Sequence, residues 1–259
     1  MAIAKSETMK PTILFTAAAA VMLFAACDGD GKTRNRSAAS AATGHRTNAP
    51  ARGQVDWARQ IVATPEGGFR MGNPNAPVKI VEFGSMTCHV CRDFSAQSTP
   101  ALEDKYVRSG KVSYELRNYI RDPYDVVAAL LARCGGPRPY FKLTEQLFTE
   151  QNAFVAKAQA ITPAQAQAIS VLPRPQQFVR LAAIMGLDRF ADVRGIPAAK
   201  ANACLTNQAE LDRLLAMTQA ADKDFGVTGT PTFVINGKVI DRTVSWADLE
   251  PRLNAALGR

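Results

Sequence analysis

The stretch Gly84-Ser85-Met86-Thr87-Cys88-His89-Val90-Cys91-Arg92-Asp93-Phe94 carries two cysteines separated by two residues. The run before it, residues 78–83, is mostly apolar and is typical of a buried strand. The segment that begins near Cys88 has helical spacing, and its expected inward positions are Phe94, Pro100, Leu102 and Tyr106. The sequence therefore predicts a cysteine pair at the point where a strand turns into a helix.

The predicted position of the pair favours redox chemistry. The start of a helix stabilises a negative charge, because its first N–H groups are unpaired and the helix dipole is positive there. A thiolate is such a charge, and it is the reactive form of cysteine. We therefore expect Cys88 to be the nucleophile and Cys91, one turn further on, to resolve a mixed disulfide.

Half of a zinc site is the alternative explanation of a Cys-x-x-Cys pair. Zinc would need two more ligands, and His89 is too close in sequence to serve easily. Cys134 and Cys204 could supply them in principle, but neither forms a second Cys-x-x-Cys. We favour the redox interpretation, which needs neither a metal nor a cofactor.

Two polar residues near the pair have two interpretations each. Protonated His89 could stabilise the Cys88 thiolate, or it could be an exposed loop residue with little influence. Glu82 stands in the apolar strand six residues before Cys88. A buried carboxylate there could relay the proton of Cys91, whereas a glutamate on an edge strand would only face solvent.

A proline precedes a later strand-like run, Thr232-Phe233-Val234-Ile235. Proline cannot donate to a sheet ladder, so Pro231 belongs at a strand start or in a special turn. A cis Thr230–Pro231 bond facing the dithiol would leave the Thr230 backbone free to pair with an extended substrate. A trans proline that only begins the strand is the other possibility.

The N-terminal part of the chain resembles an export signal. Two lysines precede an apolar run of about 14 residues, which is short for a membrane span of roughly 20 residues. Ala25-Ala26-Cys27 is similar to the lipobox of bacterial lipoproteins, although Phe24 stands where those proteins usually have leucine. We expect export, with a lipid on Cys27; a plain cleaved signal and an uncleaved anchor are the alternatives.

Composition and charge narrow the function classes. The segment 28–52 is polar, has no apolar period and is predicted to be a flexible tether. The chain of 259 residues is 47% hydrophobic, which is enough for a sizeable core. Its net charge is +8, but the basic residues are scattered and form no compact patch with aromatics, so we expect no nucleic-acid partner.

The rest of the chain reads as two β-containing parts around a helical region. Strands are expected between the turn clusters at 65–68 and 72–77 and at 78–83, 111–119, 230–235 and 238–241, the last two joined by an Asn236-Gly237 hairpin turn. Helices are expected to begin near 88 and to span about 123–134, 140–150, 162–168, 176–185, 197–204, 208–225 and 245–257. Capping signals stand at Asn207 and Ser245.

Cys134 and Cys204 both lie at predicted helix ends in the helical region. In an oxidising compartment two such cysteines tend to pair, and the other cysteines already have roles. A disulfide between them would stabilise the fold by roughly 4 kcal/mol on the chain-entropy model. Two buried free thiols are the alternative.

These motifs together resemble the DsbA-like branch of the thioredoxin-fold proteins. The resemblance rests on residues 77–83, Cys88-His89-Val90-Cys91 and 229–237, and covers the chain from about Trp57 onward. It implies an α/β thioredoxin-like fold, a mixed central sheet flanked by helices, interrupted by an all-α insertion. It also implies Cys88 as nucleophile, Cys91 as resolving cysteine, Glu82 as buried acid and Pro231 as cis-proline.

The expected organisation follows from this resemblance. Residues 1–27 are the signal, 28–52 the tether, 53–121 and 226–259 the two parts of the thioredoxin fold, and 122–225 the helical insertion. Well-known oxidases of the family have Cys-Pro-His-Cys; here His89 follows the first cysteine and Val90 takes the histidine position. This difference leaves the oxidising strength open, and Thr230 does not decide it.

The expected function is an exported, monomeric thiol–disulfide oxidoreductase in the periplasm, anchored to the inner membrane through lipid on Cys27. Its clients would be unfolded or partly folded exported proteins with free cysteines, and disulfide formation is the favoured direction. The resemblance implies reoxidation by a quinone-linked membrane partner, or a membrane reductant if the direction is reversed. Alternatives are a disulfide reductase or isomerase, a binding or chaperone module, and a glutathione-transferase-like isomerase, which the export signal opposes.

Overall fold

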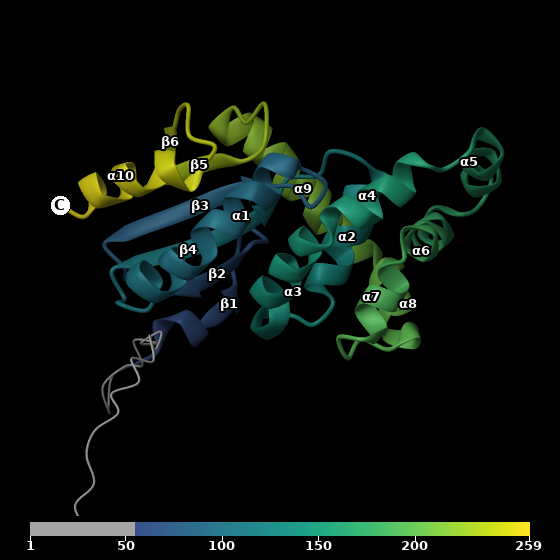
Figure 1. Ribbon diagram of the computed structural model, residues 1–259, viewed down its shortest axis with the longest axis horizontal. Coiled ribbons are helices and arrows are strands. Elements are labelled where there is room, and N and C mark those ends of the chain that lie inside the picture. The colour runs from purple at the N-terminus through teal and green to yellow at the C-terminus, as the bar shows by residue number, and fades with distance from the viewer. Residues whose placement is uncertain (1–54) are drawn as a thin grey trace, which may run out of the picture. The chain divides into compact units, whose positions relative to one another are not determined.

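The computed structural model describes residues 55–259, which are coloured in Figure 1. The predicted signal at 1–27, with Cys27, and the whole of the predicted tether at 28–52 lie outside the described residues. A single turn of 3₁₀ helix, Trp57–Arg59, precedes the first strand.

Six strands form one mixed sheet in the order β1-β2-β4-β3-β5-β6. The parallel pair β3/β4 lies at its centre, and the remaining neighbours pair antiparallel. The strands are β1 (Ile61–Ala63), β2 (Phe69–Gly72), β3 (Val78–Gly84), β4 (Val112–Asn118), β5 (Thr232–Ile235) and β6 (Lys238–Ile240). The sheet confirms the thioredoxin-like class, and β1 is an outer strand that the sequence did not predict.

The crossover between β3 and β4 carries the cysteine pair. Helix α1 (His89–Ala101) continues directly into a π-helical segment, Leu102–Val107, before the chain enters β4. Phe94, Leu102 and Tyr106 are buried as predicted. Pro100 is exposed, so its predicted inward position is wrong. Phe94, which does face inward, lies against Phe233 of β5, with ring centroids 4.6 Å apart.

The middle of the chain is helical, as Figure 1 shows in teal and green. Proline and glycine set several of its boundaries: Pro123 begins α2, Pro163 begins α5, and Gly186 ends α6 in the left-handed conformation. Two of these helices, α4 and α7, were not predicted. The helices are α2 (Pro123–Arg133), α3 (Pro137–Thr149), α4 (Gln151–Gln159), α5 (Pro163–Ser170), α6 (Arg174–Met185), α7 (Leu187–Asp192) and α8 (Ala198–Leu205).

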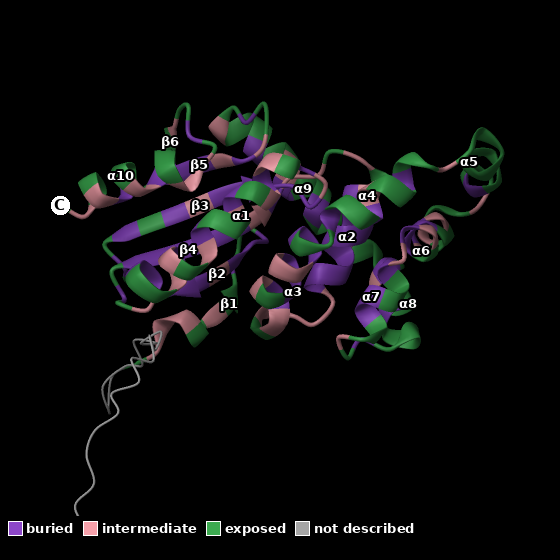
Figure 2. Cartoon of the chain, in the orientation of Figure 1, coloured by how far each residue is buried: buried purple, intermediate pink, exposed green. Residues whose placement is uncertain are grey.

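Two further helices pack on the sheet. Ala221 and Phe225 of α9 (Gln208–Phe225) join an apolar cluster with Phe83 of β3 and Val234 of β5. On the other side, α10 (Trp246–Ala256) buries Leu249 and Leu253 in the main core, to which α1 also contributes. Figure 2 shows the buried positions along the central strands. The sheet is thus covered on both faces, and α9 covers one of them although it lies within the predicted insertion at 122–225.

Local signals in the C-terminal part are confirmed. Asn236 and Gly237 both have positive φ, and they connect β5 to β6 as the hairpin pattern predicts. Ser245 caps α10 in a reciprocal pair of hydrogen bonds with Asp248. Asn207 caps α9 by accepting the backbone N–H of Glu210.

Candidate active site

Cys88 and Cys91 lie at the start of α1, where β3 delivers them. Cys88 is the N-cap of the helix, with an extended backbone, and Cys91 is its third residue. Both are free thiols, and their side chains are almost fully buried at 3% and 0% exposure. The Cys88 sulfur is therefore the one nearer to solvent.

The surroundings of Cys88 favour its thiolate. Its pKa is lowered to about 5, chiefly because the Cys91 thiol can donate a hydrogen bond to it. Burial opposes this effect, while the backbone N–H groups of Val90 and Cys91 support it. These N–H groups belong to the first turn of α1, as predicted for a thiolate at a helix start.

Cys91 behaves in the opposite way. Burial raises the pKa of its thiol well above the usual value, and hydrogen bonding to Cys88 and the charge of Glu82 add to this. The two cysteines therefore differ strongly in acidity although they are one helical turn apart. Cys88 is suited to be a thiolate and Cys91 to hold a proton.

Glu82 is a buried acid on the face of the sheet that packs against α1. It is 1% exposed, and the Tyr114 hydroxyl donates a 2.5 Å hydrogen bond to its carboxylate. Burial raises its pKa to about 8 despite that hydrogen bond. A side chain at Gly84 would place its Cβ 2.9 Å from a Glu82 carboxylate oxygen, so glycine there leaves room for the acid.

The Thr230–Pro231 peptide bond is cis, and the loop that carries it faces Cys88. The Cys88 thiol donates a 3.2 Å hydrogen bond to the Thr230 carbonyl. The Thr230 hydroxyl is buried and has no hydrogen-bond partner among residues 55–259. The structure thus brings Thr230 and Pro231 to the dithiol from the far end of the sequence.

His89 is exposed at the first position of α1. The groups that lower the Cys88 pKa include the Cys91 thiol and the backbone N–H groups of Val90 and Cys91, and the imidazole is not among them. Its placement corresponds to the interpretation of His89 as an exposed residue with little influence on the Cys88 thiolate.

Two residues that the sequence did not single out hold the active-site loop. Gln151 of α4, only 2% exposed, donates 2.9 Å hydrogen bonds to the carbonyls of both Met86 and Cys88. Asp125 of α2 accepts a 2.7 Å hydrogen bond from the Met86 backbone N–H. Burial raises the Asp125 pKa to about 7. The helical region therefore contacts the backbone of the dithiol directly.

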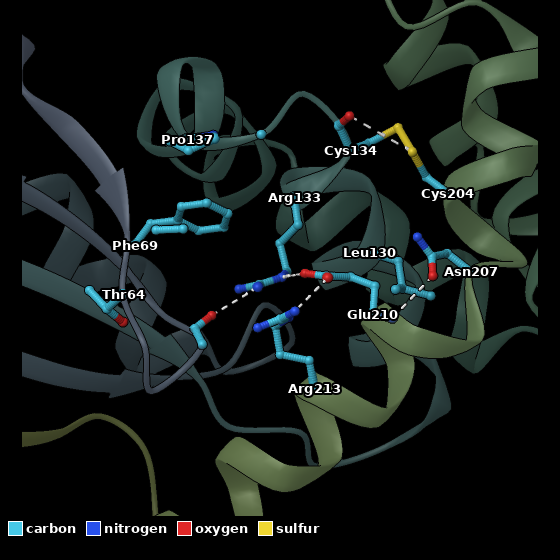
Figure 3. A pocket seen from close by; sticks show the side chains of 13 residues that line it. Thr64, Phe69, Leu130, Arg133, Cys134, Pro137, Cys204, Asn207, Glu210 and Arg213 are labelled. Atoms are coloured by element: carbon cyan, nitrogen blue, oxygen red, sulfur yellow. Dashed lines mark hydrogen bonds and ion pairs between the residues drawn. A yellow bond between two sulfur atoms is a disulfide. The ribbon is translucent and has the colours of Figure 1, made fainter.

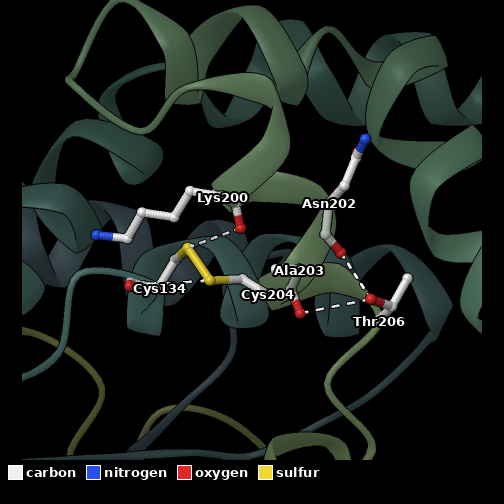
Figure 4. Close-up of a disulfide and its surroundings, with 6 residues drawn as sticks. All are labelled: Cys134, Lys200, Asn202, Ala203, Cys204 and Thr206. Atoms are coloured by element: carbon white, nitrogen blue, oxygen red, sulfur yellow. Dashed lines mark hydrogen bonds between the residues drawn. A yellow bond between two sulfur atoms is a disulfide. The ribbon is translucent and has the colours of Figure 1, made fainter. Parts of the chain in front are cut away.

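The second cysteine pair lies away from the first. A disulfide with an S–S distance of 2.03 Å joins Cys134, after α2, to Cys204 of α8 (Figure 4). Figure 3 shows the pocket of about 340 Å³ beside it, where the Arg133 guanidinium donates to Glu210.

Because they are bonded to each other, Cys134 and Cys204 are not available as zinc ligands for Cys88 and Cys91. Over residues 55–259 no group of three or more His, Cys, Asp and Glu side chains could hold a metal ion.

Comparisons with known proteins agree with this geometry. Residues 64–255 match the family described as thioredoxin. A protein-disulfide isomerase from Novosphingobium aromaticivorans is 32% identical, with a TM-score of 0.70 over 73% of this chain and 97% of that one. Wolbachia pipientis α-DsbA1, at 22% identity, shares the fold with a TM-score of 0.57 over 76% of this chain and 92% of its own.

Curated relatives named protein-disulfide oxidoreductases occur in Rickettsia. The protein of Rickettsia typhi is 29% identical over 170 residues, which cover 64% of this chain and 54% of that relative. The protein of Rickettsia bellii is 25% identical over 172 residues, 66% of this chain and 58% of its own length. The chain therefore spans little more than half the length of these curated relatives. The family match shows that the chain belongs to the thioredoxin family, and its fold is the DsbA-like fold that it shares with α-DsbA1.

Proposed function

We propose that this protein catalyses dithiol–disulfide exchange on protein cysteines, in the direction of disulfide formation. The observation that carries the proposal is the place of Cys88 at the N-cap of α1, where the Cys91 thiol and the first N–H groups of the helix lower the pKa of the Cys88 thiol to about 5. These groups stabilise the thiolate of the reduced protein. A dithiol whose reduced form is stabilised is a strong oxidant, since it gains by accepting electrons from its client.

The reaction begins from the Cys88–Cys91 disulfide. A client thiolate attacks the Cys88 sulfur, a new S–S bond forms, and Cys91 leaves with the electron pair of the old bond. The Cys91 thiolate takes up a proton, which the high pKa of its thiol favours. Glu82, with a pKa of about 8, is still largely protonated at neutral pH and is suited to supply this proton.

The second step releases the oxidised client. A second client thiolate attacks the client's own sulfur in the mixed disulfide, and Cys88 leaves as a thiolate. Its low pKa makes it a good leaving group. The client loses two electrons and two protons; the enzyme gains two electrons and one proton, and the other proton goes to solvent.

The equilibrium of the Cys88–Cys91 pair against glutathione tests the direction. We expect a reduction potential of about −120 to −180 mV, in the range of oxidases and isomerases. A potential near −270 mV, as in thioredoxin, would show that the protein reduces its clients instead.

Isomerisation is the second candidate, because the solved relative at 32% identity is titled a protein-disulfide isomerase. An isomerase must attack a wrong disulfide with its reduced Cys88 and then release the rearranged client. Reactivation of a scrambled disulfide protein by the reduced enzyme would support this function. Oxidation of a reduced client without such reactivation supports the oxidase.

The place of action and the partners are also part of the proposal. The signal-like segment 1–27 and the lipobox-like Ala25-Ala26-Cys27 support export and a lipid anchor. A disulfide between Cys134 and Cys204 suits an oxidising compartment such as the periplasm. Clients would then be exported proteins, and a quinone-linked membrane protein would reoxidise the enzyme.

Mass spectrometry of the membrane form tests the lipid anchor; an N-terminus cleaved beyond Cys27 would exclude it. No helix between residues 55 and 259 is long and apolar enough to span a membrane.

A further inference from the structure

A cleft of about 290 Å³ opens directly beside the reactive sulfur. Three parts of the chain form it: the start of α1, the segment after β4 and the loop before the cis-proline. Because Cys88 lines the cleft, a client segment bonded to its sulfur lies beside it. It is lined by Cys88, His89, Val90, Tyr119, Arg121, Thr228, Gly229 and Thr230.

The cleft contains positive charge without a carboxylate. Arg121 is exposed, and within residues 55–259 its guanidinium forms no hydrogen bond or ion pair with another side chain. The neighbouring acids lie outside the cleft: Asp122 accepts a hydrogen bond from Thr87, and Asp125 is buried against the Met86 backbone. Asp222 accepts a hydrogen bond from the Tyr119 hydroxyl and does not line the cleft either. The Arg121 guanidinium can therefore pair with a bound molecule.

The other side of the same loop differs in charge. A second cleft of about 300 Å³ shares Thr228, Gly229 and Thr230 with the first, but it is lined by both Asp241 and Arg242. A client lying across the loop would meet both signs of charge on that side. The cleft at Cys88 is lined by Arg121 and by no carboxylate, so charge selection is expected there and not beyond the loop.

We propose that the cleft beside Cys88 selects client segments with an acidic residue next to the reactive cysteine, and that Arg121 is the residue that recognises it. This inference rests on the proposed function. An acidic side chain would pair with the guanidinium, whereas a basic one would be repelled by it. The Arg121 side chain is exposed, so the preference for acidic client segments is moderate, and added salt weakens this preference.

The test uses three dithiol peptides that differ only in the residue beside the first cysteine: glutamate, glutamine or lysine. Each rate of oxidation by the full-length protein is divided by that peptide's rate with oxidised glutathione, which removes the intrinsic reactivity of its thiol. We expect the normalised kcat/KM of the glutamate peptide to exceed that of the lysine peptide by about fivefold to tenfold at low salt. The ratio should fall below about twofold at roughly 0.5 M salt.

The variant Arg121→Gln should reduce the glutamate-to-lysine ratio to below about twofold at low salt as well. Arg138→Gln is the matched control, because it removes the same charge. Arg138 is exposed on α3 and lines neither cleft. The control variant should keep the wild-type ratio. Equal ratios in wild type and Arg121→Gln, or an equal loss in Arg138→Gln, would overturn the inference and leave the proposed function standing. If the wild-type protein oxidised none of the peptides, the proposed function would itself be wrong.

Discussion

The two cysteine pairs of this protein have opposite surroundings. Cys88 and Cys91 lie one helical turn apart at the start of α1, as free thiols with strongly different acidity. Cys134 and Cys204 are 70 residues apart in sequence and join two helices as a disulfide. The first pair is surrounded by hydrogen-bond donors and a buried acid, and the second closes a long loop in the helical region.

This contrast separates reactivity from stability. A short-range pair constrains the unfolded chain little, so its disulfide can be formed and broken at small cost to the fold. A pair that closes a long loop stabilises the fold. Breaking its disulfide serves no reaction in this structure. Placement relative to helix ends and sequence separation distinguish the two roles.

Removing the Cys88 sulfur should have the largest effect. Cys88→Ser is expected to lower the rate of client oxidation by about a thousandfold or more, because the Cys88–Cys91 disulfide that the client thiolate attacks can no longer form. The double variant Cys134→Ser/Cys204→Ser should keep that rate in its folded fraction. Peptide oxidation followed by mass spectrometry measures both. Comparable activity loss in the two variants would remove the distinction between the pairs.

The second pair should dominate stability instead. Replacing Cys134 and Cys204 by serine is expected to lower the free energy of unfolding by roughly 4 kcal/mol, the chain-entropy value for a loop of this length. Guanidinium unfolding of the double variant and of wild type, both with the Cys88–Cys91 pair reduced, gives the difference. A loss smaller than that caused by Cys88→Ser would contradict the structural role.

The buried acid should make stability depend on pH. Glu82 has a folded pKa of about 8, above its usual 4.5, so its contribution to stability is present below 4.5 and is lost as pH rises through 8. Between about pH 5 and pH 8, wild type should lose roughly 3 kcal/mol relative to Glu82→Gln. Parallel unfolding curves at the two pH values measure the loss; an identical pH dependence would show that Glu82 titrates normally.

The hydrogen bonds from Gln151 should have the smallest effect on stability. Gln151→Leu leaves the Met86 carbonyl without its donor and removes one of the two donors of the Cys88 carbonyl, which still accepts the Arg92 N–H; the expected cost is about 1–3 kcal/mol. Gln167→Leu, at an exposed position of α5, is the control and should change stability by less than about 0.5 kcal/mol. Equal stability of the two variants would mean that the helical region does not hold the active-site loop.

The central features of the fold could be predicted from the sequence because they depend on local chemistry. The apolar run before Cys88, the Asn236-Gly237 turn and the Ser245 cap each specify their conformation within a few residues. β1 was missed because it has three residues, two of them exposed, and α4 because its apolar positions show little helical period. Pro100 was placed inward from its spacing alone, although α1 turns it to solvent.

The site was predictable only where motifs mark it. Cys88, Cys91, Glu82 and Pro231 stand in recognisable surroundings, so they could be named from the sequence. Gln151 could not, because its role depends on how α4 lies against the Met86 and Cys88 carbonyls. Tyr114 was also missed; its contact with Glu82 follows from the parallel register, in which Ile80 pairs with Tyr114 on the same face.

The central claim is that the fold stabilises the Cys88 thiolate, and titration of the reduced protein by the ultraviolet absorbance of thiolate tests it most directly. One transition with a midpoint near pH 5 is predicted, and it should disappear in Cys88→Ser. The Cys91 thiol should titrate only far above its usual range. A Cys88 midpoint close to the ordinary value of 9.0 would contradict the account.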